Sequence, residues 1–420
     1  GFDDWKEFRA FALKLTDLET PPQPVRHMEL TANEGNPFVP SNVKEVTVAL
    51  HDVKQNVWEG ELSVSYADEI GTTAQRELSA DEEVAEASFA LPSPSSPCSV
   101  IQLDARLGPQ QETYYSALFP VSSVPVRCTT YTESEYLVYE ADNGMIRISA
   151  AADYYPALRS LAVQGKEWLA SGFPEYGIRS WWNPWIGGLT DQIDDLSPTS
   201  VRKEEHSASF VSVTDDKGNV WSGIRIRQSI QQHEVYKGTI LDSYYLLLPG
   251  APVLAFMTDI RQSTGAYLEK TALSEMFLRF DELRSSSEHC EPAASGKSGD
   301  AGWLRTFAPD GKVLRYAIGK DELNVRESKD YGFGFDGRAG VMQIVTDETV
   351  NRPSLYTNKD ICCLSFSRNV RLPHGNAFQS APVFFVFSDA LLPTEGLEAV
   401  RRLSFPPILE SNDIEGAQTE

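Results

Sequence analysis

The chain has few cysteines, and their spacing shows no pattern. Its 420 residues contain five, which are Cys98, Cys128, Cys290, Cys362 and Cys363. The number is odd, and no paired spacing suggests a disulfide framework or a zinc site. The last two lie in an apolar run in which neighbouring side chains would point to opposite faces of a strand. We therefore expect buried free thiols and no cofactor, and the sequence indicates no metal centre, although calcium bound by carboxylates alone would leave no such pattern.

Positive charge and long apolar runs are also scarce. The chain has 37 Lys plus Arg against 60 Asp plus Glu, a formal net charge of −23, so its field repels phosphate backbones and anionic membranes. No apolar run approaches the roughly 18 residues of a membrane helix. These absences exclude nucleic acid and membrane as expected partners and leave neutral ligands, among which sugars are a large class.

The N-terminal segment has a helical period. Apolar residues at Trp5, Phe8, Phe11 and Leu15 fit one face of a helix, and prolines follow. We assign residues 1–24 to a helix and linker, which either packs on the sheet below or continues from an upstream domain. The sequence carries no secretory signal, which predicts a cytoplasmic location, but it starts at Gly1 rather than Met, so a signal could have been removed.

From Val43 onward the apolar period is two, which is typical of strands. Residues 25–125 combine short alternating segments with polar turns and predict a small immunoglobulin-like β-sandwich. Its expected strands include Val46–Leu50, Leu62–Tyr66, Ala87–Leu91, Val100–Leu107 and Thr113–Phe119.

Residues 130–407 continue as strands without crossover helices, which predicts a large antiparallel sandwich and an all-β fold class. One helix is expected at Thr394–Leu403, with Thr394 as its cap, and residues 408–420 are expected to be a disordered acidic tail. The expected strands are Met145–Ser149, Leu158–Val163, Phe210–Thr214, Ile224–Ile230, Ser243–Leu248, Val253–Ile260, Ala272–Arg279, Val313–Ile318, Val341–Thr346, Cys362–Ser367 and Pro382–Ser388.

One part of this region has a recognisable layout. An Asn143-Gly144 turn leads into a strand, a second strand carries Ser160-Leu161, and a turn at Gly165 leads to Glu167. This resembles the opening hairpin of galactose mutarotase-like domains, and the resemblance would cover roughly residues 133–406. It implies a β-supersandwich with a role in carbohydrate binding or processing.

In mutarotases a Glu and a His perform acid–base chemistry on the sugar. The histidines considered for that role are His206, His233, His289 and His374, and the carboxylates are Glu234, Glu275 and Asp281. The family's histidine motifs cannot be placed on this sequence. Glu275 with His233 or His289 is the pair we would test, and whether the chain is an enzyme stays open.

The segment Ser180–Gly188 holds three of the eight tryptophans. A Pro and two Gly residues within it predict a loop. In one interpretation Trp181, Trp182 and Trp185 form a sugar platform, because indole faces stack on pyranose rings, with hydrogen bonds from Asn183, Arg179 and Asp191. In the other the loop plugs the core of the sandwich. Both stay open.

Three functions follow from these patterns. The first is a carbohydrate-binding or carbohydrate-processing accessory region of a larger multidomain protein, as in glycoside hydrolases. The second is an independent mutarotase, epimerase or related hydrolase, which needs a His and a carboxylate across one cleft. The third is a structural or interaction module with buried tryptophans. We favour the first.

Overall fold

The computed structural model describes most of the chain from residue 28. The described ranges are 28–52, 60–66, 74–78, 84–90, 97–107, 110–193, 196–279, 302–307, 313–318, 323–326, 333–337, 340–346, 351–358, 360–408, 412–414 and 418–419. The expected N-terminal helix lies outside them, as do His289, Asp281 and Cys290.

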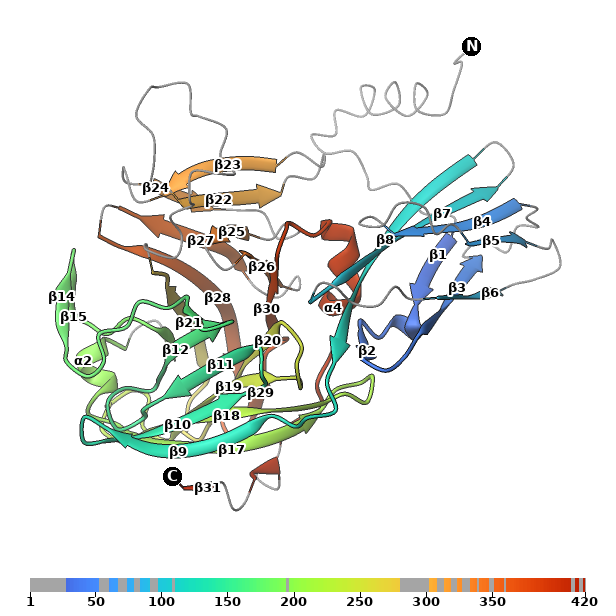
Figure 1. Cartoon of the computed structure of the whole chain (residues 1–420). Coiled ribbons are helices and arrows are strands. Elements are labelled where there is room, and N and C mark those ends of the chain that lie inside the picture. Colours follow the sequence, from blue (N-terminus) through green and yellow to red (C-terminus); the bar gives the residue numbers. More distant parts are fainter. Residues whose placement is uncertain are drawn as a thin grey trace, which may run out of the picture.

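Two large antiparallel sheets form most of the molecule, which confirms the all-β fold class (Figure 1). The first has eleven strands, ten of which follow the order β24-β27-β28-β21-β16-β12-β11-β10-β9-β31, with β13 paired to β12. Their bounds, in that order and ending with β13, are Leu323–Arg326, Asn351–Thr357, Cys362–Leu372, Leu268–Phe277, Leu189–Ile193, Ala157–Val163, Ile146–Ala150, Tyr136–Asp142, Arg127–Glu133, Gln418–Thr419 and Lys166–Glu167.

The second sheet has ten strands in the order β17-β18-β19-β20-β30-β26-β25-β22-β23, with β29 paired to β20. Their bounds, in that order and ending with β29, are Glu205–Thr214, Val220–Ile230, Thr239–Leu247, Val253–Gln262, Val383–Ser388, Gly340–Val345, Phe333–Gly337, Gly302–Phe307, Val313–Ile318 and Ala377–Gln379. A helix, α2 (Pro198–Val201), precedes β17 and is capped by the Ser197 hydroxyl.

The main core lies between these sheets. Alternate residues of each strand point inward, such as Ile146 and Ile148 from β11 and Ile224 and Ile226 from β18, and all four are fully buried. Cys362 joins this core, whereas its neighbour Cys363 packs on the other face of β28 beside Phe277. This confirms the expectation of buried thiols on opposite faces, and burial raises the pKa of Cys362 to about 12.

The N-terminal region forms two smaller sheets, drawn in blue to cyan in Figure 1. One holds β1 (Met28–Ala32), β3 (Glu45–Asp52) and β6 (Val84–Ala90). The other follows the order β2-β8-β7-β4-β5, with bounds Phe38–Pro40, Gln110–Val121, Ser99–Leu107, Gly60–Tyr66 and Ala74–Leu78. A 3-10 turn, η1 (Asn33–Gly35), joins β1 to β2.

An apolar cluster joins the N-terminal region to the large sandwich. Phe38 of β2 and Phe119 of β8 pack with Trp221 and Tyr244 on the outer face of the ten-stranded sheet. The Phe38 and Trp221 rings meet edge to face, with centroids 5.4 Å apart. The assignment of residues 25–125 and 130–407 as separate domains stays a prediction. The two regions contribute apolar side chains to one common cluster.

The C-terminal part returns to this sandwich. The predicted helix at Thr394–Leu403 is two short turns, η2 (Thr394–Leu397) and α4 (Glu398–Arg401), with Pro393 rather than Thr394 at the cap position. Farther on, the backbone N–H of Ile414 donates to the carbonyl of Phe210 at 2.8 Å, and β31 pairs with β9. Residues 413–414 therefore lie against β17, the outer strand of the ten-stranded sheet, and β31 extends the eleven-stranded sheet beyond β9.

Candidate functional site

The tryptophan-rich segment is a hairpin of two short strands, β14 (Gly177–Arg179) and β15 (Trp182–Trp185). The predicted loop is therefore wrong for Trp182–Trp185. The chain reverses at Ser180, whose φ is +52°, and Arg179 then pairs with Trp182. Tryptophan favours strands, and this local preference outweighs the Pro and Gly signals on which the loop prediction rested. In Figure 1 the hairpin lies at the left edge of the molecule.

Two glycines fix the base of the hairpin. Gly187 and Gly188 have φ of +71° and +80°, which favours glycine. Gly188 donates its N–H to Ala170 at 2.7 Å and accepts the N–H of Phe277 at 2.9 Å. The hairpin is thereby attached to the end of β21, and its aromatic side chains have a fixed position.

The three tryptophans occupy different environments. Trp185 is only 3% exposed and packs with Phe277 and Cys363, as the core interpretation expects. Trp181 is 59% exposed, and its ring stacks on the half-buried Trp182 with centroids 4.6 Å apart and planes 21° apart. One indole therefore belongs to the core, and a stacked pair faces outward as a platform would.

A groove of about 620 Å³ lies beside the hairpin. The guanidinium of Arg179 lies 4.0 Å from the centre of the Trp185 ring and connects the hairpin to the groove. The described residues that line the groove are Glu133, Arg159, Ser160, Glu167, Leu169, Ala170, Ser171, Phe173, Arg179, Leu278 and Arg279. A cavity of this size can hold a small sugar.

Both carboxylates of the groove have partners. Glu133 accepts a hydrogen bond from Arg159 at 2.5 Å. Arg159 also donates to the Tyr131 hydroxyl at 3.0 Å, and its guanidinium lies over the Phe173 ring. Glu167 accepts from the Ser160 hydroxyl and from the backbone N–H groups of residues 161 and 169, at 2.8 and 2.9 Å.

The remaining predicted ligand residues do not all come to this site. Asn183 is exposed on β15, within the hairpin. Asp191 of β16 is only 2% exposed and accepts hydrogen bonds from the hydroxyls of Ser243, Thr258 and Ser274 between the two sheets. Burial raises its pKa to about 6. Since its carboxylate is enclosed by hydroxyls, we do not place Asp191 at the sugar site.

The weak catalytic candidates lie apart along the fold. Glu275 of β21 is beside the aromatic cluster, with its Oε1 4.0 Å from the Sγ of Cys363. His233 lies between β18 and β19 of the other sheet and stacks on Tyr236. His374 is exposed and accepts the N–H of Gly265, and Glu234 is also exposed. Burial lowers the pKa of His206, which lies at the start of β17.

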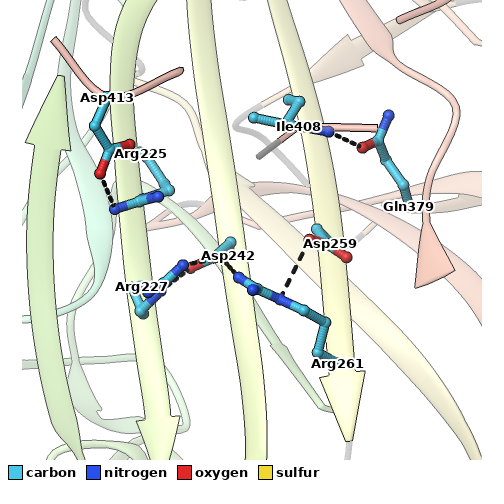
Figure 2. Close-up of polar contacts among 8 residues, drawn as sticks. All are labelled: Arg225, Arg227, Asp242, Asp259, Arg261, Gln379, Ile408 and Asp413. Atoms are coloured by element: carbon cyan, nitrogen blue, oxygen red, sulfur yellow. Dashed lines mark hydrogen bonds and ion pairs between the residues drawn. The ribbon is translucent and has the colours of Figure 1, made fainter. Parts of the chain in front are cut away.

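A row of charged residues crosses β18, β19 and β20, and the sequence analysis missed it (Figure 2). Arg227 donates to both carboxylate oxygens of Asp242, at 2.8 and 2.9 Å, and Arg261 donates to the same carboxylate. Asp259 lies 3.6 Å from Arg261. The available signal was the alternation of charged and apolar residues within the predicted strands Ile224–Ile230 and Val253–Ile260.

This row also contacts the C-terminal segment. Arg225, two residues from Arg227 on β18, donates to Asp413 at 2.8 Å, and Gln379 accepts the backbone N–H of Ile408 at 3.1 Å (Figure 2). These contacts give the row a structural role in holding the segment. In the part of the chain that the structure describes, no three His, Cys, Asp or Glu side chains converge as metal ligands would, and no helix is long and apolar enough to span a membrane.

Comparison with known proteins gives similarities of fold. No protein-family model and no curated protein matches the chain. Among solved structures, a TPR-domain containing protein from Parabacteroides distasonis matches with a TM-score of 0.40 and 12% identity over 69% of this chain and 50% of its own. This chain therefore spans about half the length of that protein.

Two further matches carry names from the fold family that the sequence analysis expected. A putative aldose 1-epimerase from Klebsiella pneumoniae has a TM-score of 0.37 and 9% identity over 72% of this chain and 86% of its own. A galactose mutarotase related enzyme from Lactobacillus acidophilus has a TM-score of 0.34 and 10% identity over 60% and 97%. Likeness at this level concerns the fold alone.

Proposed function

We propose that this chain binds carbohydrate at the hairpin groove, as an accessory β region of a larger protein. The observation that carries the proposal is the stacked pair of Trp181 and Trp182, whose outer indole is 59% exposed, on the hairpin whose Arg179 lines a groove of about 620 Å³. A large exposed aromatic ring is costly to leave in water and is favoured at binding surfaces. Its flat face matches the CH face of a pyranose, and the polar groups of the groove match hydroxyls.

The catalytic alternative has less support from the geometry. Acid–base work needs two titratable groups on opposite sides of one bond. The carboxylates of Glu133 and Glu167 are both engaged within the protein, and no histidine is among the described residues that line the groove. Binding without turnover therefore fits the groove better.

Replacing Trp181 by Ala tests the proposal. We expect roughly tenfold weaker binding of a glycan ligand, because one stacking ring contributes about 1 kcal/mol or more. The melting temperature should change little, since the ring is exposed. Binding is measured by tryptophan fluorescence and calorimetry with a panel of neutral and acidic oligosaccharides.

Trp185→Ala is the matched control, because this ring belongs to the core. Its removal should lower the free energy of unfolding by about 3–5 kcal/mol. If the wild-type protein binds no member of the panel, or if Trp181→Ala binds as tightly as the wild type, the proposal is wrong.

A further inference from the structure

We propose that the ligand of the hairpin groove is a sugar that carries a carboxylate, and that Arg179 binds this carboxylate. The inference rests on the proposed function and narrows its ligand class. It departs from the neutral ligand that the overall charge of −23 favoured.

The charges of the groove are the first step. Three arginines line it, Arg159, Arg179 and Arg279, against two glutamates. Glu133 is paired with Arg159, and Glu167 accepts three hydrogen bonds from the protein itself. Three guanidinium groups against two carboxylates leave the described lining of the groove with one positive charge in excess.

The position of Arg179 is the second step. Its side chain is exposed, and no carboxylate among the described residues forms an ion pair with it. The flat face of its guanidinium rests on Trp185, 4.0 Å from the ring centre. Stacking uses the face and leaves the N–H donors, which lie in the guanidinium plane, free for a ligand. The contact also fixes the side chain, so less conformational entropy is lost on binding.

The third step is the match between guanidinium and ligand. The planar fork of an arginine fits the two oxygens of a carboxylate, and such charge-assisted pairs are stronger than neutral hydrogen bonds. Arg179 pairs with Trp182 across the hairpin, and the exposed ring of Trp181 stacks on Trp182. One hairpin therefore offers a ring surface and an anion-binding group, and a uronic acid presents both complementary features.

The acidic surface of the protein does not prevent this binding. At physiological salt the Debye length is about 8 Å, so exposed charges farther away are largely screened. The charges within the groove then decide the local preference.

The experiment uses matched ligands that differ only in charge. Trisaccharides of galacturonate and mannuronate are compared with their methyl esters, which keep the sugar rings and lose the negative charge. A trisaccharide of neutral sugars, with and without a sulfate group, completes the set. With the whole chain we expect the acids to bind at least about tenfold more tightly than their esters, and added salt to reduce this preference.

Arg179→Gln should abolish the preference for the acid over the ester, and Arg179→Lys should restore it only in part, because a lysine lacks the planar fork that fits both carboxylate oxygens. Arg371→Gln is the control for net charge. Arg371 is an exposed residue on β28 that pairs with Glu269, and it lies roughly 26 Å along the strand from Cys363 at the hairpin.

The outcomes separate the inference from the proposed function. Equal binding of acid and ester overturns the inference and leaves carbohydrate binding intact. If the sulfated sugar binds more tightly than both uronates, the groove does not select a carboxylate and the inference is wrong. If the preference for the acid over the ester persists in Arg179→Gln, Arg179 is not the residue that binds the carboxylate. Binding of none of the sugars overturns the proposed function together with the inference.

Discussion

Asp191 and Asp259 are carboxylic acids enclosed by the fold, and burial raises the pKa of each to about 6. Their partners differ. Asp191 accepts hydrogen bonds from three hydroxyls, whereas Asp259 lies in the charged row beside Arg261. In an unfolded chain an aspartate has a pKa of about 3.9. Each group therefore holds its proton more tightly in the folded protein than in the unfolded chain. This difference stabilises the folded state at pH values at which the folded protein still holds the proton.

This gives a prediction for stability against pH. Below about pH 4 both states of the chain hold the proton of Asp259, and above about pH 6 both have lost it. Between these values only the folded state holds it, so the free energy of unfolding should fall as the pH rises through this window. The groups facing Asp259 are Asp242, Arg227, Arg261 and Tyr244, of which the arginines oppose the shift.

The Asp259→Asn variant should show a smaller decline between pH 4 and pH 6 than the wild type. Asp191 shifts in the same direction, so part of the decline should remain. Urea unfolding at half-unit pH steps measures both curves. Curves that run parallel across this window would contradict the assignment.

At the scale of elements, the hairpin depends on how closely the backbone approaches Gly188. A Cβ on this residue would lie 2.3 Å from the carbonyl oxygen of Leu158 on β12. Gly165 has nearly the same φ, +78° against +80°, but a Cβ there would meet nothing within 4 Å. The two glycines thus separate the effect of backbone conformation from that of close packing.

We expect Gly165→Ala to lower the free energy of unfolding by about 1–2 kcal/mol, from its left-handed backbone alone. Gly188→Ala should lower it by more than about 3 kcal/mol and should weaken glycan binding, because the hairpin must shift away from β12. Chemical denaturation and the glycan assay measure the two effects. Equal losses of stability in the two variants would show that the contact with Leu158 is unimportant.

The strands could be predicted where apolar residues alternate, and less well where they do not. The run Cys362–Ser367 was found because both of its faces are largely buried. Strand β9 was missed, since its sequence from Arg127 to Glu133 is mostly polar and it lies next to the outermost strand of its sheet. The alternation of apolar and polar residues arises because one face of a strand is buried, and strands near the edge of a sheet are less buried.

The site was harder to predict, because its parts are distant in sequence. Trp181 and Arg179 were candidates because they lie in one local motif, although that motif predicted a loop and left the exposure of the tryptophans open. Glu133 and Arg279 reach the same groove only through the order of strands in the eleven-stranded sheet. Asp191 was assigned to the sugar site from its closeness in sequence, but the alternation of β16 turns it into the core.

At the scale of the whole molecule, the apolar cluster around Phe38 and Trp221 joins the N-terminal sheets to the large sandwich. Separate domains would each bury their own apolar residues, and here the two regions bury a common set. The connection after β8 is also held, because Ser122 donates its N–H to the carbonyl of Pro249 at 2.8 Å.

We therefore expect the two regions to unfold together in a single calorimetric transition. Phe38→Ala should lower the free energy of unfolding by about 3–5 kcal/mol and shift the whole transition, although Phe38 belongs to the smaller region. Differential scanning calorimetry tests this. Two resolved transitions, of which Phe38→Ala moves only the first, would show that the regions are independent.

The C-terminal residues also have a consequence for association between molecules. Asp413–Ile414 lie against β17, and β31 pairs with β9. An uncovered outer strand offers free N–H and C=O groups to any other extended chain. When these residues detach, each large sheet therefore exposes a strand on which a second molecule could add one of its own.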